Sequence, residues 1–136
     1  MRGGVLIING TVSLFTGFNI HIGKNAVLSI DEGTFINENS LISIAKKCEI
    51  GKNCAISNNV TIIDSNFHEI NGEMSNEEVK IGDKVLIGIN TTILKGATIG
   101  DNCVIGAESL VSKKIEKNTI VAGRPAMFIK ECKDWK

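Results

Sequence analysis

Isoleucine or valine returns at intervals of six residues through most of the second half of the chain. The positions are Ile50, Ile56, Ile62, Ile81, Ile87, Ile93, Ile99, Ile105 and Val111. A period of six is neither the 3.6 of a helix nor the 2 of a half-buried strand, and it is typical of a hexapeptide solenoid. We therefore predict an all-β chain in which three hexapeptides close a triangular coil of roughly 18 residues, with this ladder of aliphatic residues inside.

Two more columns follow the same period. A small or slender side chain stands two positions before the next ladder position, as at Cys54, Val60, Val85, Thr91, Ala97, Cys103 and Ser109. Three positions after a ladder residue stand Asn53, Asn59, Asn90, Gly96 and Asn102. Asn and Gly tolerate a positive φ, which a sharp corner requires. Each hexapeptide is therefore predicted to be a short strand followed by a corner.

The first half of the chain keeps the same frame with less regularity. The step from Ile22 to Ile30 and the step from Ile36 to Ile44 are eight residues long instead of six. These steps predict faces that carry two-residue bulges. Residues 1–20 are rich in β-forming side chains but weakly phased, so irregular first coils are expected there.

The C-terminal end, residues 119–136, departs from the repeat. Pro125 is the only proline and stands where a helix could begin. We predict a C-terminal cap with a short helix, which would close the open end of the solenoid. Residues 1–136 would then form one domain. The apolar stripe of this helix would contain Met127, Phe128, Cys132 and Trp135.

The ladder has one large interruption, and this interruption contains a histidine. The next in-frame position after Ile62 is 68, but the ladder resumes at Ile81, so that 13 residues are inserted. The inserted loop, at about residues 64–80, carries His68. An imidazole changes its charge near neutral pH and is a common general base. The other histidine, His21, is expected to point outward with a structural or surface role.

Composition narrows the possible functions. Fifteen basic and fifteen acidic side chains give a formal net charge of +0, which argues against a nucleic-acid or membrane-surface partner. No apolar run is long enough to span a bilayer, so a cytoplasmic location without membrane insertion is expected. The four cysteines do not form a disulfide framework. Cys48, Cys54 and Cys103 are predicted to be inert core residues, and Cys132 a bystander thiol.

Two stretches resemble a known family. The run from residues 79–83 to residues 123–126, together with residues 63–68, is similar to hexapeptide-repeat acetyltransferases. The branch contains galactoside and maltose acetyltransferases and many polysaccharide O-acetyltransferases. The resemblance implies a left-handed parallel β-helix, acetyl-CoA as co-substrate, no metal, and a homotrimer with sites between neighbouring prisms. Leu86 stands where galactoside-type members usually carry tryptophan, which speaks against a simple galactoside or maltose acceptor.

The same resemblance implies roles for individual residues. His68 would act as general base for direct attack of a sugar hydroxyl, and the backbone N–H of Ile89, from a neighbouring subunit, would stabilise the oxyanion. The acceptor would be held by Asn37, whose neighbour Asn39 also fits the corner column, and by Asp64 and Glu69. The coenzyme would contact Gly88, Ala107, Ser112, Lys113, Arg124 and Lys130, with Lys114 a looser candidate.

Three other functions remain open at this level. A carbonic anhydrase of the γ class shares this fold but needs three histidine ligands for zinc, and the chain has only two histidines. A non-catalytic β-helix module would not need His68. N-acetylation of an amino sugar would use His68 in the same role. The preferred acceptor is a sugar hydroxyl of a cell-surface polysaccharide or its precursor.

Overall fold

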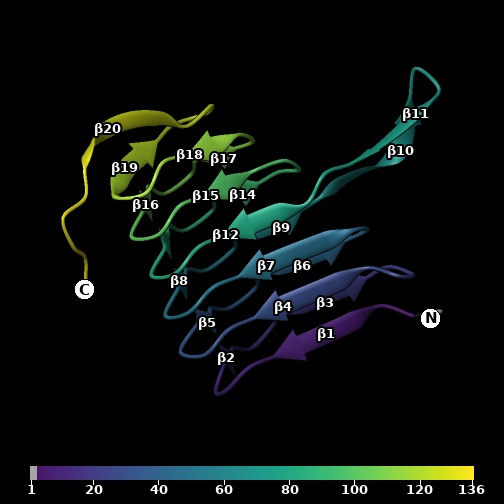
Figure 1. Cartoon of the computed structure of the whole chain (residues 1–136), viewed down its shortest axis with the longest axis horizontal. Coiled ribbons are helices and arrows are strands. Elements are labelled where there is room, and N and C mark those ends of the chain that lie inside the picture. Colours follow the sequence, from purple (N-terminus) through teal and green to yellow (C-terminus); the bar gives the residue numbers. More distant parts are fainter. Residues whose placement is uncertain (1–2) are drawn as a thin grey trace.

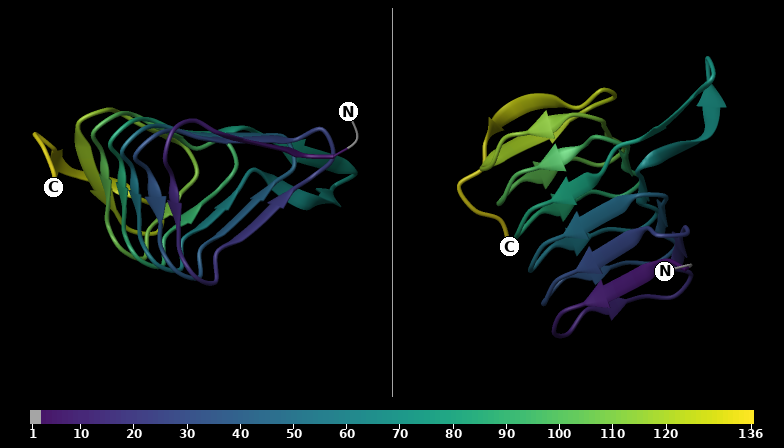
Figure 2. Two further views of the ribbon diagram at one scale, coloured as in Figure 1. Left: turned by 90° about the horizontal axis from the view of Figure 1, so that it is seen from below. Right: turned by 45° about the vertical axis from the view of Figure 1, so that its right-hand side comes forward.

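The computed structural model describes residues 3–136 and forms a triangular β-solenoid (Figures 1 and 2). Each coil contributes one strand to each of three walls, except that the last coil has no strand in wall C. Wall A consists of β1 (Val5–Ile8), β4 (Val27–Ile30), β7 (Lys47–Ile50), β12 (Val79–Ile81), β15 (Thr98–Ile99) and β18 (Lys114–Ile115). Wall B consists of β2 (Ser13–Leu14), β5 (Phe35–Ile36), β8 (Ala55–Ile56), β13 (Leu86–Ile87), β16 (Val104–Ile105), β19 (Thr119–Ala122) and β20 (Met127–Glu131). Wall C consists of β3 (Asn19–Ile22), β6 (Leu41–Ile44), β9 (Thr61–Ile63), β14 (Thr92–Ile93) and β17 (Leu110–Val111).

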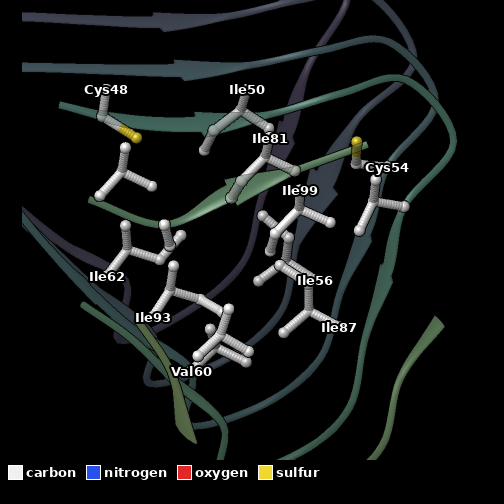
Figure 3. Close-up of a cluster of buried hydrophobic side chains, with 14 of the residues drawn as sticks. Cys48, Ile50, Cys54, Ile56, Val60, Ile62, Ile81, Ile87, Ile93 and Ile99 are labelled. Atoms are coloured by element: carbon white, nitrogen blue, oxygen red, sulfur yellow. The ribbon is translucent and has the colours of Figure 1, made fainter. Parts of the chain in front are cut away.

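The ladder residues stack directly on one another inside the prism. In wall A, Ile50 pairs with Ile81, which pairs with Ile99 in the next coil, and all these strands are parallel. The ladder side chains are at most 2% exposed and converge on the axis (Figure 3). Burial of each such side chain contributes about 1.5–3 kcal/mol to stability. The predicted solenoid is therefore confirmed, and its parallel stacking is consistent with a left-handed β-helix.

The predicted positions of the corners are confirmed. Positive φ values occur at the predicted corner asparagines, including Asn53 (55°), Asn90 (61°) and Asn102 (56°). The small column lies just inside these corners, where several of its hydroxyls and thiols bond to neighbouring coils. The Cys54 thiol donates to the Gly82 carbonyl at 3.1 Å, and burial raises its pKa to about 11. The thiol therefore stays protonated at neutral pH, as expected for an inert core residue.

One corner residue carries avoidable strain. Glu108 has a φ of 58° although it is neither Asn nor Gly, and its side chain is exposed. We expect Glu108→Asn to raise the free energy of unfolding by about 0.5–1 kcal/mol, because Asn adopts this conformation more readily. Chemical denaturation measures the change. Glu38→Asn, at an exposed position without a positive φ, should give no gain, and an equal gain at both positions would contradict the explanation.

The first coil is more regular than the sequence suggested. Strands β1, β2 and β3 pair in parallel with the equivalent strands of the second coil. The phasing of β1 is obscured because it lies at the end of the stack and is apolar throughout, with Leu6 and Ile7 both about 40% exposed. The eight-residue steps are also not bulges. They lengthen the strands, so that β4 buries both Leu28 and Ile30 in continuous register with β7.

The predicted C-terminal helix is wrong. No helix occurs in residues 3–136, and β20 instead runs antiparallel to β19, with Ala122 paired to Met127. The turn between them contains Pro125. The outer edge of β19 would otherwise expose a row of unpaired backbone groups, and an added strand satisfies them where a helix would not. Met127 and Phe128 are consequently exposed.

The C-terminal tail descends along the corner between walls A and B (Figure 1). Asn102 donates from its amide nitrogen to the carbonyls of Cys132 and Lys133. Trp135 donates from Nε1 to the Lys84 carbonyl at 2.8 Å, and the Lys84 ammonium pairs with Asp134. Cys132 is only 3% exposed, so this thiol is buried and does not belong to a polar surface segment. The tail thus ties three coils together.

Candidate active site

The inserted segment is a β-hairpin and not an open loop. Strands β10 (Ser65–Ile70) and β11 (Glu73–Asn76) are antiparallel and extend away from the coil stack (Figures 1 and 2). Their two-residue turn has positive φ at Asn71 (54°) and Gly72 (78°), as a tight hairpin turn requires. The hairpin leaves the prism at the corner between walls C and A. It carries His68 outside the prism wall, and this side chain is exposed.

A bulge interrupts the hairpin immediately before His68. The strand register shifts between Ser65 and Glu69, and Phe67 has a φ of 57°. The Ser65 hydroxyl stabilises this conformation by accepting a hydrogen bond from the Phe67 N–H at 2.9 Å. A bulky residue in the left-handed region is strained by about 1–3 kcal/mol, and such strain often occurs at functional sites. Bulges redirect side chains, so this one sets the direction of His68.

Asp64 is not available to bind an acceptor. It is 0% exposed, and its two carboxylate oxygens accept hydrogen bonds from the backbone N–H groups of Ala45, Lys46 and Lys47, each at 2.7 Å. The predicted substrate contact at Asp64 is therefore wrong, because a buried carboxylate with these partners cannot reach a bound molecule. Glu69 is exposed beside His68.

A second group of candidate residues lies along the corner between walls B and C. Gly88 is required there by packing, because an added Cβ would lie 2.5 Å from the Ala107 nitrogen of the next coil. The N–H groups of Gly88 and Asn90 donate to neighbouring coils, whereas the N–H of Ile89 has no acceptor among the described residues. The candidates on this corner are Asn37, Gly88, Ile89, Ala107 and Arg124.

The remaining candidates surround the last coil. Ser112 and Lys113 form the corner from β17 to β18, and Lys130 lies on β20; all three are exposed. The ladder step there is four residues, from Val111 to Ile115, so this corner is tighter than the others. Two cavities open beside it, of about 430 Å³ and about 170 Å³. Their shared lining consists of Lys113, Ile115 and Ala126.

One chain does not bring all these residues together. His68 leaves the corner between walls C and A, whereas Asn37 and Ile89 lie on the corner between walls B and C. The width of wall C separates the two corners, and five extended residues span roughly 16 Å. The two groups can meet only if the hairpin of one chain lies against the corner of another.

The hairpin also has a support that the sequence did not reveal. The Lys95 ammonium donates to the Ser75 hydroxyl at 3.0 Å, and the Gly96 N–H donates to the Glu77 carbonyl at 3.3 Å. Lys95 belongs to the corner of the next coil, about 20 residues away in sequence. Its position in an ordinary corner gave no sign of this contact.

The described residues offer neither a metal centre nor a membrane helix. Within residues 3–136, no three His, Cys, Asp or Glu side chains are grouped so that they could hold a metal ion. In the same part of the chain, no helix has the length and apolar character needed to cross a bilayer.

Comparisons with known proteins agree with this architecture. Residues 78–113 match the family model described as bacterial transferase hexapeptide (six repeats). Over 129 residues the chain is 41% identical to galactoside O-acetyltransferase of Escherichia coli (strain K12). This alignment covers 87% of the present chain and 57% of the relative. The chain thus spans little more than half the length of this relative.

Solved structures resemble the whole solenoid. A galactoside acetyltransferase in complex with coenzyme A superposes with a TM-score of 0.77 at 34% identity, over 93% of this chain and 64% of that chain. The polysialic acid O-acetyltransferase OatWY superposes with a TM-score of 0.74 at 26% identity, over 98% of this chain and 87% of that chain. Both similarities extend well beyond the residues matched by the family model.

Proposed function

We propose that this chain is a hexapeptide-repeat acetyltransferase and that it transfers an acetyl group from acetyl-CoA to a sugar hydroxyl. The observation that carries the proposal is the exposed His68 on a braced hairpin that interrupts an otherwise regular solenoid. His68 accepts the hydroxyl proton while the oxygen attacks the thioester carbonyl. The C–S bond then breaks, and the imidazolium returns this proton to the departing thiolate, so that the coenzyme leaves as its thiol. General base catalysis of this kind contributes about 10²–10⁴-fold.

The corner between walls B and C supplies the complementary groups. The unpaired N–H of Ile89 stabilises the oxyanion of the tetrahedral intermediate. Asn37 is half-buried on the same corner and can hydrogen-bond the acceptor. The exposed Glu69 beside His68 contacts the acceptor or orients the imidazole. These roles require a hairpin and a corner from two different chains.

The coenzyme lies along the last coils. The larger cavity beside Lys113 is largely apolar in its lining, which suits the pantetheine arm. Lys113, Arg124 and Lys130 are exposed around the two cavities and provide positive charge for phosphates. Ala107 is small enough to allow close approach of the arm, and the Ser112 hydroxyl is available as a polar contact.

A homotrimer completes the site in this proposal. From the second coil onward the outward column of wall A is polar, from Ser29 to Lys114. The outward column of wall B is apolar from Phe35 to Ile120, which marks this wall as a contact surface. The hairpin is equally unusual, because Phe67, Ile70 and Met74 are each more than 40% exposed. Packing of the hairpin of one chain against its neighbour would cover both surfaces. The apolar column consists of Phe35, Ala55, Leu86, Val104 and Ile120.

A turnover assay tests the proposal. Acetyl-CoA is incubated with the protein and a panel of sugars, amino sugars and serine, and release of the free thiol is measured. The expected result is thiol release with a sugar that carries no free amine. Alkaline hydroxylamine should remove the product's acetyl group, since it cleaves esters but not amides. A hydroxylamine-resistant product would identify an N-acetyltransferase, and the absence of turnover with any acceptor would favour a non-catalytic module. A cytoplasmic location is part of the proposal.

The trimer makes a separate prediction at wall B. We expect Leu86→Asp to produce a monomer, because an outward charge in the apolar column would be buried at the contact. Acetyl transfer should fall by at least about tenfold, because the two halves of the site no longer meet. Light scattering after size exclusion measures the mass, and circular dichroism confirms the fold. Lys80→Asp, on the polar column of wall A, is the control, and an equal effect there would argue against wall B.

A further inference from the structure

Asp64 occupies an unusual position at the base of the hairpin. It immediately precedes β10, and its carbonyl accepts a hydrogen bond from the N–H of Glu77, the first residue after β11, at 3.0 Å. Both legs of the hairpin therefore meet at Asp64. Whatever fixes this residue fixes the root of the whole hairpin.

The carboxylate of Asp64 is fixed by the coil below. Three successive backbone N–H groups of the corner at residues 45–47 converge on its two oxygens at 2.7 Å. Such a concave group of N–H donors is a strong anion site, and it compensates the buried charge without a basic side chain. The hairpin root is thus tied to a different coil through three charge-assisted bonds.

This attachment reaches His68 through a short and constrained path. Ser65 follows Asp64, is itself buried, and accepts the hydrogen bond of the Phe67 N–H. Phe67 holds its positive φ next to His68. Because each link in this path has a defined geometry, a shift of the Asp64 backbone would move or release the bulge that directs the imidazole. The Lys95 contact holds the other leg from the coil above.

We propose that Asp64 is a positioning residue, whose carboxylate locks the root of the hairpin to the corner at residues 45–47 and so holds His68 in one orientation. The inference rests on the proposed acetyl transfer. Asp64 does not act as a base or as a partner of the imidazole, since its oxygens are already occupied and it is 0% exposed. Its effect on catalysis is exerted entirely through the backbone.

Two variants and a control test the lock. Asp64→Ala removes all three bonds, and Asp64→Asn keeps the shape but turns an amide N–H toward backbone donors. Asp101→Asn is the control, because Asp101 also accepts a corner N–H, that of Asp83 at 2.7 Å, but at the corner between walls A and B. Hydrogen exchange is measured without substrate for residues 65–76 and for the coils, and kcat and KM are measured with acetyl-CoA.

We expect the Asp64 variants to lose exchange protection in the hairpin while the coils keep theirs. The kcat value should fall by about 10²-fold with Asp64→Ala and less with Asp64→Asn, because small displacements of a catalytic group have effects of this size. The KM for acetyl-CoA should change by less than about twofold, since the coenzyme contacts lie elsewhere.

Other outcomes would overturn the lock. Unchanged hairpin exchange in Asp64→Asn would show that the carboxylate does not hold the root, and equal loss of protection in the coils would make Asp64 a general stabilising residue. Looser exchange with normal kcat would also reject a positioning role. A wild-type protein without turnover would instead reject acetyl transfer, and the exchange data would still test the attachment.

Discussion

Ile99→Asp prevents folding of the coil stack. Ile99 is 1% exposed and lies between Ile81 and Ile115 of the neighbouring coils, and among residues 3–136 no buried Lys or Arg is available to pair with a carboxylate. An unpaired charge in an apolar interior destabilises a protein by more than about 4 kcal/mol, and lost packing adds to this. Total stabilities are about 5–15 kcal/mol, so one such substitution removes most of the margin.

The neighbouring residue provides a matched control. Thr98 is on the same strand but points outward and is exposed, between Lys80 and Lys114 of the adjacent coils. We expect Thr98→Asp to leave the melting temperature within a few degrees of wild type, measured by circular dichroism. A folded Ile99→Asp protein with an unchanged melting temperature would refute the inward ladder, and similar losses in both variants would show that the strand tolerates no charge on either face.

Local periodicity predicted the coils because every hexapeptide must meet the same two structural requirements. A ladder residue must be apolar, and a corner residue must tolerate a positive φ, so both requirements select recognisable residue types in the repeats. The corner at Lys84 lacks this mark, yet its φ is 53°. There the ion pair with Asp134 and the bond from Trp135 hold the corner from outside. The sequence did not reveal this because the tail lies 50 residues away.

The C-terminal helix was wrongly predicted for a different reason. A proline followed by apolar residues is locally compatible with a helix. The deciding factor was the open edge of β19, a property of the assembled wall and not of the segment itself. The same edge explains why β20 pairs antiparallel, since a short turn at Gly123 allows no parallel crossover.

The candidate site also contains one residue that the sequence revealed and one whose surroundings it did not. His68 was found because it interrupts the period, which is a feature of the sequence alone. The burial of Asp64 was not predicted because its partners are backbone N–H groups 17–19 residues earlier, and backbone groups leave no sequence signal. Its position before the histidine suggested a substrate contact. Only its burial and its three short bonds distinguish an anchor from a ligand.

The solenoid supports the exposed hairpin, whereas the hairpin contributes little to the stability of the solenoid. The hairpin stores strain at Phe67 and presents apolar side chains to solvent, neither of which stabilises the monomer. Attachment at Asp64 and Lys95 allows the stack to hold it in place. A catalytic group on such an arm can be removed without weakening the core, which separates tests of catalysis from tests of folding.

His68→Ala should therefore greatly slow acetyl transfer while the protein stays folded. The side chain is exposed on the hairpin, so its removal disturbs no packing in the prism. Without a base, the hydroxyl must attack before losing its proton, and kcat should fall by about 10²–10⁴-fold. The KM for acetyl-CoA should change little, because in the proposed mechanism the imidazole acts on the acceptor and only in the transition state.

The other histidine supplies the control for this loss. His21 is exposed on wall C, and His21→Ala should retain wild-type turnover and the same melting temperature. Thiol release from acetyl-CoA and thermal denaturation are measured for both variants. Near-normal turnover of His68→Ala would show that another group accepts the proton. Glu69 would then be the first residue to substitute. A large loss in His68→Ala with an unchanged melting temperature would leave base catalysis from the hairpin as the physical explanation, because His68 is exposed and lines neither of the two cavities beside Lys113.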